Sequence, residues 1–230
     1  MAMAGPAVAQ DLSISLGDDG SLAGRSIQLL VLITVLSLVP GIAIMVTCFP
    51  FIVTVFAILR QAIGLQQSPP NMLIVSLALF LTYFVMEPVF NEAWAAGISP
   101  LLNDTISMEE AFMRAMEPLR VFMAARIEVG TFAALAELRP DVAAQTLVVD
   151  APLSVMVPSF LLSEMERAFQ VGFMIFIPFL IIDLVVAAVL MSMGMMMVPP
   201  AIVSLPFKLA FFVVADGWGL IATSLVRSYN

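Results

Sequence analysis

The sequence predicts an all-α, membrane-associated protein built from helical hairpins, and three observations agree on this. Of the 230 residues, 62% are hydrophobic and 11% are charged, whereas soluble domains carry about 25% charged residues. The mean hydropathy is +1.08. Uncharged apolar runs of membrane length recur along the chain, separated by stretches that contain Pro, Gly and polar residues. We therefore expect helical hairpins, the last of them long and antiparallel.

The same composition argues against several classes of function. The net charge is −8, and basic residues are not interleaved with aromatic ones, so nucleic acid is not an expected partner. The chain has no His, the commonest metal ligand and general base. Its one cysteine, Cys48, lies in an apolar run and is expected to be a small buried hydrophobe. Asp183 and Asp216 fall at different heights of the expected hairpin, so they do not form a protease pair. We expect no enzyme, catalytic residue, metal or cofactor.

The first 26 residues are expected to lie outside the helical part of the protein. Ala7-Val8-Ala9 has the small-x-small form of a signal-peptidase site, with cleavage before Gln10. The charged and apolar regions of a signal peptide do not precede it, so either the true start lies upstream or the pattern is accidental. We expect residues 1–9 to be a signal-peptide remnant. Residues 10–26 are expected to be a flexible arm on the outer side of the membrane.

Residues 27–90 predict a pair of N-terminal apolar helices that form a hairpin. The run from Ile27 to Leu59 has 33 uncharged residues, and about 20 suffice to cross a membrane. Either one long helix kinks near Pro40, or two shorter helices meet there. We favour the kinked helix because no polar turn residues interrupt the run.

A polar loop at 60–71 precedes the second apolar run, which extends from Met72 to Phe90 and is about one membrane thickness long. Asn71 is expected to cap the start of this helix. Pro88 is expected to end it, because the residue before a proline is disfavoured in the helical region.

Residues 91–157 predict a helical insert outside the membrane, because charged residues concentrate there. Ser107-Met-Glu-Glu110 has the form of a capping box. Pro118 is expected to kink or split the helix that follows, and Arg139-Pro140 to end it. Arginines in a loop favour the cytoplasm, but long loops escape this rule. We place the insert with the N-terminus, on the periplasmic side.

Residues 158–230 predict a long C-terminal hairpin, entered at Val157-Pro158 and returning to about Val226. Its apex is the stretch Val189–Pro200, in which Gly194 and the proline pair are turn signals. Five of the seven residues from 191 to 197 are methionine. Met is unbranched and polarizable, so it commonly fills a crowded helix corner. The same softness would let a ring of such tips close a pore around varied passengers, and the composition leaves both interpretations open.

Charged residues inside this hairpin are placed symmetrically about its apex. Asp183 and Lys208 lie at equal sequence distances on either side of residues 195 and 196, and so do Glu164 and Arg227. A charge buried in an apolar medium needs a partner. The spacing leaves open whether these pairs close within one chain or between copies. A subunit of a pore for a large passenger fits, and so does an ion-coupled transporter that uses Asp183 and Lys208 as a relay, although no internal repeat supports the transporter.

Several motifs are specific enough to resemble one family. They are Leu59-Arg-Gln-Ala-Ile-Gly-Leu-Gln-Gln-Ser-Pro-Pro-Asn, Phe169-Gln-Val-Gly-Phe with Ile-Phe-Ile-Pro-Phe-Leu-Ile-Ile-Asp-Leu-Val, Met191 to Pro206, and Asp216-Gly-Trp. The match covers residues 30–229 and resembles the FliP family, the export-gate subunits of flagellar type III secretion systems. Injectisome counterparts share the loop and Met motifs, but Met86-Glu-Pro-Val-Phe and the insert fit the flagellar branch better.

The resemblance implies an oligomeric, pentamer-like cone of FliP copies with FliQ and FliR, in the bacterial inner membrane at the flagellar basal body. It also implies FlhA and FlhB as further export components, FliO as an assembly factor, and unfolded flagellar proteins as the passengers. Carried over by position, a lumen-facing gasket would comprise Met191, Met193, Met195, Met196 and Met197, where Met193 departs from the residue usual in the family. In such a cone, four charged residues would pair across interfaces and specify assembly: Asp183, Lys208, Glu164 and Arg227.

Overall fold

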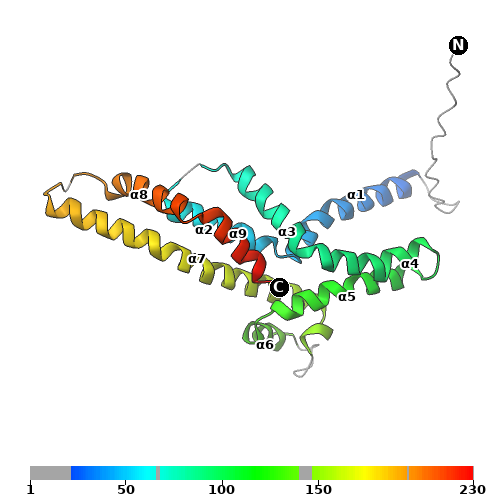
Figure 1. Ribbon diagram of the computed structural model, residues 1–230. Coiled ribbons are helices and arrows are strands. Elements are labelled where there is room, and N and C mark those ends of the chain that lie inside the picture. The colour runs from blue at the N-terminus through cyan, green and yellow to red at the C-terminus, as the bar shows by residue number, and fades with distance from the viewer. Residues whose placement is uncertain (1–21, 66–67, 140–146, 196, 230) are drawn as a thin grey trace, which may run out of the picture. The chain divides into compact units, whose positions relative to one another are not determined.

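The computed structural model describes residues 22–65, 68–139, 147–195 and 197–229, and all regular secondary structure in those ranges is helical (Figure 1). The all-α expectation is confirmed. The chain divides into two units, Met1–Gly41 and Ile42–Asn230. The expected signal-peptide remnant and residues 10–21 of the expected arm lie outside the described residues.

Helix α1, Leu22–Met45, belongs mostly to the first unit and has apolar residues on all sides. It begins inside the range expected as a flexible arm, so residues 22–26 are helical. Its described apolar side chains are exposed, with Ile27, Leu30, Ile33 and Leu36 each more than 60% accessible. A helix that is apolar all round suits a lipid environment. The stretch Ser26–Met45 is long and apolar enough to cross a membrane.

The first apolar run forms two helices, so the expectation of one long kinked helix is wrong. Helix α1 passes through Pro40, and α2, Phe49–Ile63, begins after a break at residues 46–48. Pro50 explains the position of this break. A proline ring clashes with the carbonyl four residues earlier, but it is well tolerated in the first turn of a new helix.

Helix α2 is a core element of the second unit. Its 15 residues reach about 22 Å, less than the hydrocarbon thickness of a membrane. It packs against α3 and α7, and the fully buried side chains of the core include Phe51, Ile52, Val55, Phe56 and Leu59. Gly172 of α7 permits this contact, because a Cβ there would lie 2.5 Å from Cδ1 of Ile58.

Helix α3, Asn71–Ala93, runs through Pro88 and continues as a π-helical turn, η1 (Trp94–Ile98), and a short helix, α4 (Ser99–Leu102). The expected end near Pro88 is therefore wrong. The reason is tertiary packing, since α3 packs against α2 and α5, η1 packs against α5, and Met86 is completely buried. Asn71 does not cap the helix either. Its side-chain oxygen accepts a hydrogen bond from the Arg60 guanidinium.

The insert contains α5 (Met108–Arg126), α6 (Val129–Glu137) and a 3₁₀ turn, η2 (Val148–Asp150). Ser107 caps α5, accepting from the Glu110 amide at 3.2 Å. The Glu110 carboxylate does not complete a capping box, because it bonds Arg114 at 2.6 Å.

Pro118 lies inside α5 without splitting it, contrary to one expectation. The chain breaks at residues 127–128, where the Glu128 carboxylate accepts from the Thr131 amide at 2.6 Å and so starts α6. Two hydrogen bonds from backbone amides, of Thr131 and Gly130, hold the pKa of Glu128 below its usual value. The break between α5 and α6 therefore lies at residues 127–128 and not at Pro118.

The C-terminal hairpin is confirmed. Helix α7, Leu153–Ser192, has 40 residues and starts five residues before Pro158. The return limb consists of α8 (Pro200–Val214) and α9 (Gly217–Arg227), which meet at a bend of 60°. Asp216 stands at this bend with φ +47°. Figure 1 shows α8 running back along α7.

Candidate functional site

The tip of the α7–α8 hairpin is a defined turn. Gly194 has φ +73°, in the left-handed region that favours glycine. The Met195 amide donates to the Leu190 carbonyl at 3.0 Å, and the Gly194 amide donates to the Met191 carbonyl at 3.1 Å. These are the two hydrogen bonds of a Schellman motif, which satisfies the last carbonyls of a helix. The glycine predicted as a turn signal thus ends α7, and Pro200 opens α8.

The tip methionines that the structure describes differ in how they are packed. Met191, Met193 and Met197 are 61%, 64% and 97% exposed, and Met195 is 39% exposed. Met193 and Met195 also line a cavity of about 580 Å³ between α7 and α8, whose other lining residues are all Ile, Val, Leu or Phe. Met196, the fifth expected gasket residue, lies outside the described residues.

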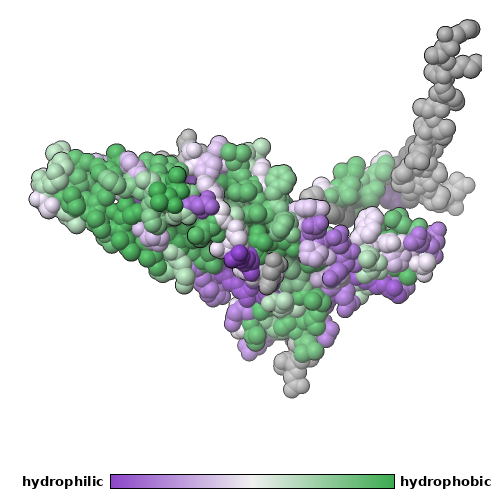
Figure 2. All heavy atoms as spheres, viewed as in Figure 1, coloured by the Kyte–Doolittle hydropathy of each residue, from purple (hydrophilic) through white to green (hydrophobic). Residues whose placement is uncertain are grey.

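The outer half of the hairpin exposes apolar side chains along both helices. Leu184, Val185 and Val189 of α7, and Ile202 and Phe207 of α8, are each more than half exposed. Figure 2 shows hydrophobic residues over this hairpin, while hydrophilic residues gather over α4 and α5. A contiguous apolar surface of this kind marks contact with lipid or with another protein.

Asp183 and Lys208 form the predicted pair, and they do so within one chain. The Lys208 ammonium donates to Oδ2 of Asp183 at 2.7 Å, and the Ser204 hydroxyl donates to Oδ1 at 2.6 Å. Lys208 also donates to the Ala62 carbonyl at 3.1 Å. That carbonyl belongs to the last turn of α2, where helical carbonyls lack partners and a cation is favoured. The pair therefore ties α7 and α8 to the end of α2.

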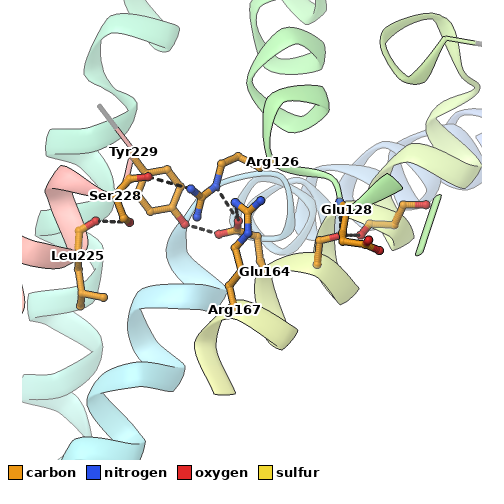
Figure 3. A network of polar contacts seen from close by, with 9 residues as sticks. Arg126, Glu128, Glu164, Arg167, Leu225, Ser228 and Tyr229 are labelled. Atoms are coloured by element: carbon orange, nitrogen blue, oxygen red, sulfur yellow. Dashed lines mark hydrogen bonds and ion pairs between the residues drawn. The ribbon is translucent and has the colours of Figure 1, made fainter. Parts of the chain in front are cut away.

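Glu164 does not pair with Arg227 in the part of the chain that the structure describes. Its carboxylate accepts from Nε of Arg126 at 2.9 Å and from the Tyr229 hydroxyl, and Arg167 lies 4.0 Å away (Figure 3). The equal spacing of Glu164 and Arg227 about the tip therefore predicted the wrong partner. The return limb bends between α8 and α9, so residues beyond the bend no longer lie opposite the α7 residues at equal distance from the tip. Glu164 is completely buried, so its charge requires these partners.

Aromatic rings enclose this second network. The Arg126 guanidinium lies 4.0 Å from the ring centroid of Tyr229 and 5.8 Å from that of Phe51, and Phe122 stacks on Tyr229 at 6.0 Å. Burial, and then the neighbouring Glu164 carboxylate, raise the pKa of Tyr229, so its phenol stays a hydrogen-bond donor. Arg126 also donates to the Ser228 carbonyl at 2.9 Å. The network joins α2, α5 and α7 to the end of the chain.

Sequence reasoning missed Arg126 and Tyr229 as partners of Glu164. A buried Glu in an apolar helix signals that a cation must lie nearby. The identity of this cation depends on how the insert folds back on α7, and the spacing of residues in the sequence does not predict that fold. Among the described residues, no group of three or more His, Cys, Asp or Glu could hold a metal ion.

Comparison with known proteins decides the family. The FliP family model matches residues 32–225. This chain belongs to the FliP family. The FliP match includes the whole of α7 and α8 and the tip between them, and membership places the chain among proteins of flagellar biosynthesis.

Individual FliP relatives are similar over nearly the whole chain. The flagellar biosynthetic protein FliP of Caulobacter vibrioides is 52% identical over 99% of this chain and 86% of its own length. That of Rhizobium meliloti is 49% identical over 100% of this chain and 95% of its own. That of Bacillus subtilis is 46% identical over 95% of this chain and 98% of its own. The family predicted from the motifs is confirmed.

The membrane character of this FliP chain follows from its helices. Three described helical stretches are long and apolar enough to cross a membrane: Ser26–Met45, Asn71–Leu102 and Leu153–Ser192. The bent pair α8–α9 makes a fourth if it counts as one span.

Proposed function

We propose that this chain is a pore-forming subunit of the flagellar type III protein export gate. In this proposal the gate passes unfolded flagellar proteins across the inner membrane, and the Met-rich tip of the α7–α8 hairpin is its gasket. The observation that carries the proposal is the exposure of the tip. Met197 is 97% exposed and Met193 is 64% exposed at the end of a 40-residue helix, where no described part of the same chain covers them.

A ring of such tips would seal by excluding water. Apolar constrictions stop ions by dewetting, and flexible thioether side chains repack around different shapes. The Schellman turn at Gly194 supports this role, because it holds the backbone of the tip while the Met side chains stay adaptable. We assign the gasket to Met191, Met193, Met195, Met196 and Met197.

The exposed apolar faces of the hairpin support assembly with other copies and subunits. We propose a pentamer-like ring of this chain, with FliQ and FliR as further gate subunits, FlhA and FlhB as export partners and FliO as an assembly factor. The complex resides in the inner membrane at the flagellar basal body, with membrane lipid around it. The N-terminus and residues 91–157 lie on the periplasmic side.

The charged residues take different parts in this assembly. The side chain of Asp183 is 33% exposed although Lys208 is only 8% exposed, so the carboxylate can accept a further donor from a neighbouring subunit. We propose that Asp183, Lys208 and Arg227 specify assembly. Glu164 supports it from inside the chain, since its partners are intramolecular.

The gasket is tested by deleting Met195 to Met197 and reconstituting the purified gate complex in planar bilayers. We expect the deletion complex to assemble normally and to conduct small ions that the parent complex excludes. Leu substitutions at the same three positions form the matched control and should stay sealed, because they keep the constriction apolar. A deletion complex that assembles and remains sealed would contradict the gasket role.

The assembly role is tested by reversing charges. Asp183→Lys should abolish the oligomer on native gels, because two cations then face each other beside the end of α2. The double variant Asp183→Lys/Lys208→Asp should restore part of it. If Asp183→Lys assembles normally and export is lost, the carboxylate serves transport and not assembly.

Two other functions have less support. An injectisome export gate shares the same motifs, but the relatives compared above carry flagellar names. An ion-coupled transporter would use Asp183 as a proton carrier. The sequence shows no internal repeat of the kind that such transporters carry. Ion-coupled uptake into liposomes that Asp183→Asn abolishes would reverse this preference.

A further inference from the structure

The hairpin tip concentrates exposed thioether sulfur. Met191, Met193, Met195 and Met197 lie within seven residues, and three of them are more than 60% exposed. Met86, Met123 and Met156, by contrast, are completely buried in the core. Methionine oxidation follows exposure. In the single chain, oxidants dissolved in water will therefore reach the tip in preference to the core.

Other exposed methionines differ from those of the tip in their setting. Met72 lies on α3, and Met174 lies on α7 well before its C-terminal end, so neither belongs to the tip. Met108 and Met113 lie on α5 of the insert, at 73% and 64% exposure. Their helix contributes nothing to the tip, which makes them suitable internal controls.

A polar atom at the tip would have nothing to bond with in the cavity beneath it. Met193 and Met195 line this cavity, and its other walls are aliphatic or aromatic side chains without donors. Met195 is also the residue whose amide closes the Schellman motif on Leu190, and Leu190 lines the same cavity. A sulfoxide oxygen on Met195 would be left unsatisfied there unless it drew in water or moved out of the cavity.

We propose that the tip is an oxidant-sensitive site at which peroxides or hypohalous acids convert methionine to methionine sulfoxide and thereby open the seal. The proposal rests on the gasket function proposed above. With hydrogen peroxide, the sulfur lone pair attacks one oxygen, an S–O bond forms and the O–O bond breaks. The second oxygen leaves as water after proton transfer. Sulfur is oxidised by two electrons and the peroxide is reduced by two.

The physical consequence is wetting of an apolar constriction. Oxidation replaces a soft apolar side chain with a polar one, and water then remains in the ring where it was previously expelled. The change is reversible, because methionine sulfoxide reductases specific for the two epimers restore the thioether. Oxidant stress would thus cause ions to leak through the gate at the tip.

The test uses the assembled gate complex in planar bilayers, exposed to hydrogen peroxide. Peptide mass spectrometry measures sulfoxide at each methionine as a gain of about 16 Da, and conductance is recorded on the same preparation. We expect tip sulfoxide to form together with a rise in conductance. Treatment with both epimer-specific reductases should reverse both changes. The core methionines Met86, Met123 and Met156 should stay unmodified.

Two variants locate the effect. The first has Met191→Leu, Met193→Leu, Met195→Leu, Met196→Leu and Met197→Leu, and it should stay sealed under peroxide. The second has Met108→Leu and Met113→Leu, and it should leak as the parent does.

Oxidised tips without any rise in conductance would overturn the proposal, as would a leak that persists after the sulfoxides have been reduced. Either result leaves the gasket intact if deletion of residues 195–197 still causes leak. A deletion complex that stays sealed would instead remove the gasket itself.

Discussion

The buried network around Glu164 gives the sharpest stability prediction. In Arg126→Met the carboxylate loses its charge partner at 2.9 Å, and the Ser228 carbonyl loses its donor. Glu164 has no access to solvent, so water cannot replace the guanidinium. The contact of the guanidinium with the Tyr229 ring at 4.0 Å is lost as well.

The magnitude follows from what remains around the carboxylate. Removing one partner of a buried ion pair costs about 3–5 kcal/mol. The Tyr229 hydroxyl still donates to Glu164, and Arg167 still lies 4.0 Å away, so we expect the low end, about 3 kcal/mol. This corresponds to roughly a hundredfold change in the unfolding equilibrium. Replacing both charged partners, in Arg126→Met/Glu164→Met, should recover most of the loss, because an apolar pair leaves no buried charge.

The assay is reversible unfolding of the purified protein in mild detergent, followed by Trp fluorescence. Arg114→Met is the matched control. Its ion pair with Glu110 is about half exposed on both sides, and its loss should cost at most about 0.5 kcal/mol. An Arg126→Met variant that is no less stable than Arg114→Met would contradict the buried ion pair. So would a double variant that is no more stable than Arg126→Met.

The remaining predictions concern a close helix contact and the pH dependence of stability. Gly97→Ala should lower stability by about 1–3 kcal/mol, because the added Cβ would lie 2.4 Å from the Ala111 carbonyl oxygen. Gly41→Ala is the control and should not destabilise, because its added Cβ meets nothing within 4 Å. Equal melting temperatures for the two variants would contradict the close contact at Gly97. Glu128→Gln should destabilise at neutral pH, where the carboxylate of the parent is ionised and bonded to the Thr131 amide. Because the folded pKa is lowered, this contribution is complete above the ordinary value of 4.5 and is lost as the pH falls through the folded value. If the parent and Glu128→Gln differ in free energy of unfolding as much in strong acid as at neutral pH, this assignment is wrong.

Local signals predicted the hairpin tip well. Gly194 and Pro200 act through their own backbone restrictions, so their effect is readable without the rest of the fold. The equal spacing of Asp183 and Lys208 about the tip succeeded for a related reason. Two antiparallel helices joined by a short turn keep their register close to that turn, and the pair lies before the bend at Asp216.

Prolines were a poor guide to helix ends in this chain. Pro88, Pro118 and Pro158 all lie inside helices, because packing against neighbouring helices outweighs the loss of one backbone hydrogen bond. Pro50, by contrast, does mark a helix boundary, because it lies in the first turn of α2 within an apolar run. The Arg126–Glu164 contact was inaccessible to sequence reasoning because its residues meet only after the insert folds back on α7.

The central claim is that copies of this chain bring their Met tips together around one pore. Disulfide cross-linking of Met197→Cys tests it directly in assembled complexes, after Cys48→Ala has removed the buried native thiol. The claim predicts rapid cross-linking of neighbouring subunits at position 197 and none at the control Leu138→Cys, a site on the insert that is 77% exposed. Assembled complexes that do not cross-link at position 197, or that cross-link equally at both positions, would contradict it.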